Sequence, residues 1–128
     1  MNKKIFWLRL CYWWGIIADA VMAVLMLFPS RYLGFMNVNL APDSGVRYGL
    51  LNGAPLMIGW TILLFWADRK PVERKDILLL TLPVIAGYIA VEVYAVFAGW
   101  ETLRQTLLLF LQQIGMSAAF VVSYRNAR

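Results

Sequence analysis

The chain has 128 residues, of which 62% are hydrophobic and only 15% charged, and its formal net charge is +5. A soluble domain of this length has too little interior for so much apolar surface, so the composition excludes an ordinary soluble domain and predicts a lipid environment. We attribute the positive charge to membrane orientation rather than to nucleic-acid binding, because no stripe of Lys and Arg is interleaved with exposed aromatic residues.

Four apolar segments are each close to the roughly 20 residues that an α-helix needs to cross a bilayer. They cover residues 7–28, 48–67, 77–99 and 106–124. Because lipid offers no partners to free backbone groups, we expect helices rather than open strands. The predicted fold is therefore all-α, a polytopic membrane protein in which residues 1–128 form one bundle of four transmembrane helices.

The first segment has some features of a secretory signal peptide. It has a basic start, and Ala18-Asp19-Ala20 resembles a cleavage site. The apolar run nevertheless continues to Phe28, which is longer than the apolar region of a signal peptide. We therefore expect the first segment to be a spanning helix.

The three connections between the segments differ in kind. Residues 29–46 are long and partly apolar, and within them RYLGFM fits either a short helix in the headgroup plane or a plain surface loop. The second connection, ADRKPVERKD, is short and charged, and its Pro71 suits the first position of a helix. Residues 99–105 predict a tight turn.

Lysine and arginine are distributed unevenly between the two predicted sides of the membrane. The side with both termini and the second connection holds nine of them: Lys3, Lys4, Arg9, Arg69, Lys70, Arg74, Lys75, Arg125 and Arg128. The other side holds three, Arg31, Arg47 and Arg104. Because positive residues stay on the cytoplasmic side, we expect both termini in the cytoplasm. In a bacterium the membrane would be the inner (plasma) membrane.

Polar residues inside the predicted spans gather in the outer half of the bilayer. Glu92 lies seven residues before Gly99, or roughly 10 Å below the outer end of its helix at helical rise. A charged group at membrane depth costs about 2.5–3.5 kcal/mol on insertion scales, so Glu92 should face the bundle interior. The other spans contribute Asp19, Asn52, Gln112 and Gln113 at similar depth.

These residues predict a polar pocket within the bundle that opens outward. Tyr88 is one helical turn from Glu92 and shares its face, and Arg47 and Arg104 lie at the predicted rim, where they would pair with the carboxylates. The alternative is that the polar residues only join helices, at about 0.6 kcal/mol each on average. The candidate ligand-binding residues are Glu92, Asp19, Asn52, Gln112, Gln113, Tyr88, Arg47 and Arg104.

The sequence has few side chains that carry redox chemistry or bind metals, and this excludes several classes of function. Cys11 is the only cysteine, so the chain forms neither an internal disulfide nor a CxxC redox pair. The sequence has no histidine, which removes His-ligated haem, the usual zinc sites and histidine acid–base chemistry. We expect no metal, no cofactor and no catalytic residue, and we interpret Cys11 as a small buried residue.

Several functions fit these features. The first is binding of a small or amphiphilic ligand, or of a partner helix, in the pocket. The second is proton-coupled transport of a small molecule through Glu92 and Asp19. An accessory role in a larger complex and homo-oligomer formation also stay open. An enzyme that uses the two carboxyl groups as an acid–base pair on lipids ranks lowest, because no His or Cys partner is present.

The first hairpin resembles a known family. LRLCYWWGIIADAVMAVLMLFPSRYLGFM, followed by GLLNGAPLMIGWTILLFWADR, is similar to the DoxX-like group of small four-helix bacterial membrane proteins. The shared features are an apolar first helix that ends in a Pro-x-Arg segment and a Gly-rich second helix. The resemblance covers about half of the chain and implies the fold. It assigns no functional residue, and the third helix with Glu92 lies outside it.

Overall fold

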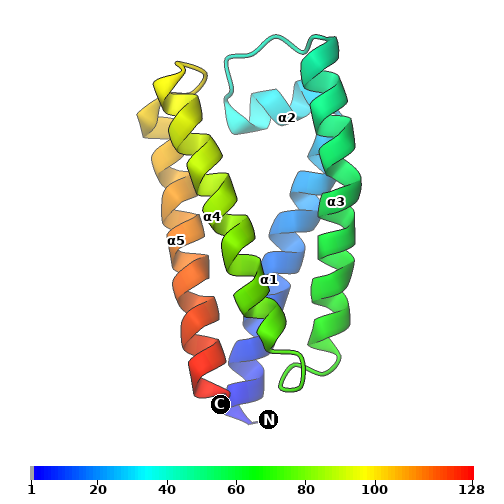
Figure 1. The fold of residues 1–128 in the computed structure, drawn as a ribbon, viewed down its shortest axis with the longest axis vertical. Helices are drawn as coiled ribbons and strands as arrows, with labels where there is room; N and C mark the ends of the chain where they lie inside the picture. The colour runs from blue at the N-terminus through cyan, green and yellow to red at the C-terminus, as the bar shows by residue number, and fades with distance from the viewer. Residues whose placement is uncertain (1) are drawn as a thin grey trace.

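The computed structural model describes residues 2–128, and within them the chain forms five α-helices. These are α1 (Lys3–Met26), α2 (Pro29–Met36), α3 (Ser44–Asp68), α4 (Asp76–Phe97) and α5 (Leu103–Asn126), as Figure 1 shows. The all-α prediction is confirmed, and α1, α3, α4 and α5 are long and apolar enough to cross a membrane. The segment for which helix and loop were both open forms α2.

Capping residues set where the helices begin and end. The Asn2 side chain accepts a hydrogen bond from the Lys4 N–H at 3.2 Å, and Asp43 Oδ1 accepts one from the Val46 N–H at 2.8 Å. α2 ends at Asn37, whose φ of 54° is a left-handed conformation that Asn tolerates better than most residues. α1 and α3 therefore begin before the apolar segments do, because hydropathy does not register polar caps and first turns.

The four long helices pack as an open row in the order α3, α1, α5, α4. α1 packs against both α3 and α5, and α5 packs against α4. α3 and α4 are consecutive long helices in the chain, yet they contact each other too little to form a packing interface. α2 lies across one end of the bundle, against α1 and α3. We call this the α2 end and the opposite one, which holds both termini, the terminal end (Figure 1).

A core shared by all four long helices exists only in the half nearer the terminal end. Its fully buried members come from every long helix: Leu8 and Tyr12 of α1, Leu64 of α3, Leu78 of α4 and Phe120 of α5. Nearer the α2 end, a second cluster joins α1 to α3 through Ala23, Met26, Ala54 and Met57. The α1–α3 and α4–α5 pairs therefore diverge toward the α2 end, as Figure 1 shows.

Two polar side chains of α1 contribute to the core near the terminal end. The Tyr12 hydroxyl donates a hydrogen bond to the Arg74 carbonyl oxygen at 2.9 Å, which ties α1 to the α3–α4 connection. The Cys11 thiol is buried and lies 3.1 Å from the Ser123 hydroxyl of α5. Both contacts satisfy polar groups that burial would otherwise leave unpaired.

Gly15 permits the close approach of α1 to its neighbours. A Cβ at this position would lie 2.9 Å from Leu64 Cδ1 and 3.6 Å from Phe120 Cζ, whereas a Cβ at Gly59 would meet nothing within 4 Å. We expect Gly15→Ala to lower the free energy of unfolding by about 1–2 kcal/mol through overpacking. The matched change Gly59→Ala should be neutral or stabilise by up to about 1 kcal/mol through helix propensity. Thermal unfolding in detergent micelles measures both, and an unchanged midpoint for Gly15→Ala would show that the helices separate there without cost.

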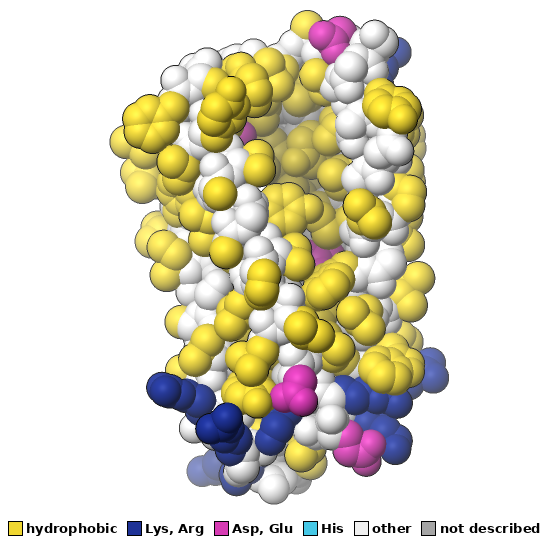
Figure 2. Space-filling model, viewed as in Figure 1, with side chains coloured by type: hydrophobic (Ala, Val, Ile, Leu, Met, Phe, Trp, Pro, Cys, Tyr) yellow, Lys and Arg dark blue, Asp and Glu magenta, His cyan; other side chains and the backbone are white. Residues whose placement is uncertain are grey.

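The surface between the two ends of the bundle is largely apolar. Figure 2 shows hydrophobic side chains along the whole length of one face, with most Lys and Arg gathered at the terminal end. Large apolar side chains are exposed on every long helix, among them Ile17, Leu56, Ile62, Val91, Phe97 and Leu108. Such a surface exceeds the apolar patches that soluble monomers expose.

Candidate functional site

The diverging helix pairs leave a hollow between α3 and α4, nearer the α2 end. Figure 2 shows this face hollowed there, with acidic side-chain atoms visible inside. The hollow follows from the packing order, because α3 and α4 form no interface and the shared core lies nearer the other end. We call it the lateral cleft. Four polar residues of this half of the bundle influence one another electrostatically, Tyr32 with Tyr88 and Glu92, and Tyr88 with Asp19, and we assign them to the cleft.

Tyr32 of α2 packs against the cluster that joins α1 to α3 and interacts electrostatically with polar residues of α4. Burial raises the pKa of the Tyr32 hydroxyl to about 12, and the neighbouring Tyr88, Glu101 and Glu92 add to the rise. A hydroxyl with this pKa stays protonated at neutral pH, so it offers a hydrogen-bond donor beside carboxyl groups. α2, which the sequence predicted as either a short helix or a surface loop, therefore contributes a residue to the candidate site.

The segment after α2 also covers the α2 end of the cleft. It runs back over this end of the bundle to the start of α3 (Figure 1), and the Asn39 N–H donates a hydrogen bond to the Trp100 carbonyl oxygen at 2.7 Å. This bond joins the α2–α3 loop to the α4–α5 turn. The sequence predicted a pocket that opens at this end, whereas the structure covers the end and leaves the opening on the side, between α3 and α4.

Glu92 is buried on the side of α4 that packs against α5. Its exposed fraction is 6%, and Gln113 Nε2 of α5 donates a hydrogen bond to its Oε1 at 2.8 Å. The second carboxyl oxygen of Glu92 and the amide oxygen of Gln113 are both buried without a hydrogen-bond partner among the described residues. A buried acceptor that lacks a donor costs about 1–3 kcal/mol. This pair is therefore able to accept two further hydrogen bonds.

A second buried acid lies beside this pair. Glu101, in the α4–α5 turn, is 9% exposed, and its Oε2 accepts a hydrogen bond from the fully buried Thr106 hydroxyl at 2.9 Å. Glu101 is close enough to Glu92 to interact with it electrostatically. Sequence reasoning missed this residue, because a carboxylate in a predicted turn is expected to face water. No local pattern in the sequence indicates its burial.

A third acid, Asp19, lies on α1. It is partly buried and interacts electrostatically with Tyr88 of α4. Within residues 2–128 no salt bridge involves it. Buried or partly buried carboxyl groups of α1 and α4 are therefore present in the half of the bundle that holds the cleft.

No basic side chain among residues 2–128 forms a salt bridge with these carboxyl groups. In the described part of the chain the two salt bridges are Arg9–Asp68 at 3.6 Å and Lys70–Glu73 at 2.9 Å, and both lie at the terminal end. The same residues contain no group of three His, Cys, Asp or Glu side chains that would hold a metal ion. The site is thus rich in acceptors and suited to a donor or a cation.

The structure brings together four of the eight candidate residues: Asp19, Tyr88, Glu92 and Gln113. Asn52 and Gln112 are exposed, and the Asn52 amide donates to the Tyr48 carbonyl oxygen of its own helix at 2.8 Å. α3 consequently does not bring Asn52, its candidate residue, to the predicted pocket. Hydropathy gives the depth of a residue in a span, whereas the rotation of the helix decides which way the residue faces.

The two arginines predicted at the rim do not pair with the carboxylates. Arg47 is exposed, and its Nε donates a hydrogen bond to the Pro42 carbonyl oxygen at 2.8 Å. Arg104 is exposed in the first turn of α5. Neither forms a salt bridge with a described residue. Both lie at the end of the bundle, where water is a better partner for a guanidinium group than a buried acid.

Comparison with protein-family models, with curated proteins and with solved structures finds no match to this chain. The resemblance of the first hairpin to the DoxX-like group stays a prediction. The function must therefore be inferred from the geometry of the cleft.

Proposed function

We propose that the chain is an integral membrane protein that crosses the bilayer four times, with both termini in the cytoplasm. Four long apolar helices and the exposed apolar surface between the ends support insertion. The nine basic residues at the terminal end support the orientation. Cations there also lie over aromatic rings, with Arg74 3.3 Å from the Trp66 ring and Lys75 5.5 Å from the Tyr124 ring. Such amphipathic rings favour the depth of the headgroups.

We further propose that the lateral cleft binds an amphiphilic ligand whose headgroup donates hydrogen bonds. The observation that carries this proposal is the buried Glu92–Gln113 pair, which retains two unpartnered acceptor oxygens. Because no basic residue neutralises Glu92 and Asp19, a cationic amine is the headgroup that suits them best. The side opening between α3 and α4 gives access from lipid, and the exposed apolar faces of these helices would contact the tail.

Proton-coupled transport is the second candidate function. Asp19 of α1 and Glu92 of α4 form no salt bridge with a described residue, and carboxyl groups at membrane depth exchange protons in transporters. A transported cation would displace a proton from one carboxyl group as it binds. Binding and transport therefore use the same residues and differ in whether the ligand crosses the membrane.

Binding of dodecylamine to the protein in lipid nanodiscs tests the primary proposal. Dodecylamine has a cationic head with donor hydrogens, whereas dodecyltrimethylammonium has the charge without the donors. We expect dodecylamine to bind at least about tenfold more tightly, since a hydrogen bond to a charged group contributes about 1.5–3 kcal/mol. Glu92→Gln should lower the affinity for dodecylamine by about tenfold or more. It keeps an amide that is able to pair with Gln113, so the fold should be retained.

Gln112→Leu is the matched control, because Gln112 adjoins Gln113 and is exposed. Its affinity for dodecylamine should equal that of the wild type. Equal binding by wild type and Glu92→Gln would contradict the proposed site. Proteoliposomes loaded with a pH-sensitive dye separate the two functions. The neutral form of the amine crosses lipid by itself, so the readout is the rate of pH change relative to proteoliposomes that contain Glu92→Gln. Transport predicts a faster change with the wild type, whereas binding alone predicts equal rates.

A further inference from the structure

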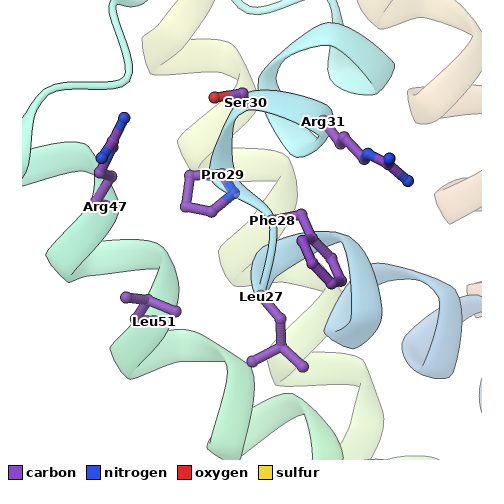
Figure 3. A pocket seen from close by; sticks show the side chains of 7 residues that line it. All are labelled: Leu27, Phe28, Pro29, Ser30, Arg31, Arg47 and Leu51. Atoms are coloured by element: carbon purple, nitrogen blue, oxygen red, sulfur yellow. The ribbon is translucent and has the colours of Figure 1, made fainter.

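A second pocket lies where α1 turns into α2, beside the start of α3, and it shares no residue with the lateral cleft. It has a volume of about 410 Å³. Its polar lining is Ser30, Arg31 and Arg47, and its apolar lining includes Leu27, Phe28 and Leu51 (Figure 3). We call it the elbow pocket.

The charged lining of the elbow pocket is entirely basic. Figure 3 shows Arg31 of α2 and Arg47 of α3 on opposite sides of the pocket. The Arg31 guanidinium lies 5.7 Å from the centre of the Phe28 ring, and Arg47 Nε donates to the Pro42 carbonyl oxygen. Neither arginine forms a salt bridge within residues 2–128, and both side chains are exposed. Two unneutralised guanidinium groups at one pocket favour an anion with several acceptor oxygens.

Polar and apolar residues of the pocket lie at different heights along the bundle. The arginines stand nearer the α2 end, and Leu27 and Leu51 lie farther toward the middle of α1 and α3, where both are nearly half exposed. Ser30 occupies the second position of α2, and helix geometry leaves its N–H without an intrahelical partner. A phospholipid bound here would have its phosphate near the arginines at the α2 end and its hydrocarbon chains near the leucines, farther from that end.

We propose that the elbow pocket binds an anionic phospholipid. The phosphate contacts Arg31 and Arg47, and the acyl chains lie along Leu27 and Leu51. This inference rests on the proposed membrane insertion, but not on the amphiphile proposed for the lateral cleft. It adds a lipid-binding site on the side of the membrane opposite the termini.

A second surface pocket, at the terminal end, serves as an internal comparison. It is also lined by basic residues, Arg9, Arg69 and Lys70, but its lining includes Glu73. Arg9 pairs with Asp68, and Lys70 pairs with Glu73. Acidic neighbours already neutralise most of its positive charge, so the elbow pocket is the stronger site for an anion.

Native mass spectrometry of protein released from nanodiscs tests the proposal. The nanodiscs contain phosphatidylcholine and phosphatidylglycerol in equal amounts, and the readout is the lipid that stays bound. We expect the wild type to retain phosphatidylglycerol preferentially. Arg31→Gln/Arg47→Gln should reduce its retention by about thirtyfold, since each of the two cations near a headgroup contributes about 1 kcal/mol. Arg104→Gln, which removes a cation from the same end outside the pocket, should retain it as the wild type does.

Three results would overturn the proposal. The wild type could retain both lipids equally, the double variant could retain as much phosphatidylglycerol as the wild type, or Arg104→Gln could lose as much of it as the double variant does. Displacement of the lipid by soluble glycerol phosphate at equal concentration would also contradict it, because a free phosphate ester would then be sufficient. Thermal unfolding in detergent micelles shows whether the double variant keeps the fold, and we expect the midpoint of the wild type. Loss of lipid retention with an unchanged unfolding midpoint therefore assigns the lipid to the elbow pocket, whether or not the lateral cleft binds an amine.

Discussion

Replacing Gln113 by leucine is expected to lower the free energy of unfolding by about 2–3 kcal/mol, because it removes the hydrogen bond of a buried carboxyl group. Gln113 Nε2 donates to Glu92 Oε1 at 2.8 Å, and Glu92 is 6% exposed. Without this donor, both carboxyl oxygens would lie unpaired between α4 and α5. Polar contacts between membrane helices contribute about 0.6 kcal/mol on average. We expect a larger loss of stability here, because Gln113→Leu leaves a buried carboxyl group without a hydrogen-bond donor.

Comparison of Gln113→Leu with a double variant distinguishes the hydrogen bond from packing. Glu92→Leu/Gln113→Leu removes both partners and should lie within about 1 kcal/mol of the wild type, because apolar replacements leave nothing unpaired. Glu92→Gln should be at least as stable as the wild type, since its amide N–H₂ is able to donate to the unpartnered oxygen of Gln113. Reversible unfolding in mixed micelles gives the values. If Gln113→Leu and the double variant lose equal stability, packing rather than the hydrogen bond is responsible.

The same pair shows how far the sequence predicts the site. The cost of inserting a carboxylate was sufficient to predict that Glu92 faces the interior, and the structure buries it. Gln112 and Gln113 are adjacent, and successive helical residues point about 100° apart, so only one of them faces α4. Which one depends on how α5 rotates against α4, and that rotation is set by contacts far from both residues in the sequence.

Residues at the ends of α2 explain why this segment is a helix, which hydropathy alone did not decide. Pro29 stands in the first turn of α2 and Asn37 follows its last turn, which are the positions these residues favour at a helix start and end. A closer reading of these two positions would have decided between helix and loop for RYLGFM. Asn52 illustrates the opposite case, because it satisfies its amide on its own helix and therefore needs no interior partner.

The open packing of the bundle could not be predicted from the sequence. Four amphipathic or apolar helices joined by short connections are equally compatible with a closed ring, in which α3 and α4 would be neighbours. The structure instead places the shared core in one half of the bundle and lets the pairs diverge in the other. The lateral cleft is a consequence of this tertiary arrangement, so its location was not available from residue depth alone.

Phe120→Ala is expected to have the largest effect on stability, a loss of about 3 kcal/mol. Phe120 of α5 is fully buried in the core that also holds Leu8, Leu64 and Leu78. Truncating a buried Phe costs about 3–5 kcal/mol in soluble proteins, and we expect the lower value because lipid removes much of the transfer contribution. Unfolding in micelles measures the loss. Phe120→Leu, which keeps most of the volume, should cost less than about 1.5 kcal/mol.

The position of Phe120 adds a second expectation, because this core joins the α1–α3 pair to the α4–α5 pair. Spin labels at the exposed positions of Leu56 on α3 and Phe97 on α4 would report the distance between the pairs. Phe120→Ala should broaden that distance distribution. Met57→Ala, in the cluster that joins α1 to α3 alone, should lower stability without broadening it. Equal broadening by both variants would mean that the two clusters act as one core, and the width of the lateral cleft would then depend on α1–α3 packing as well.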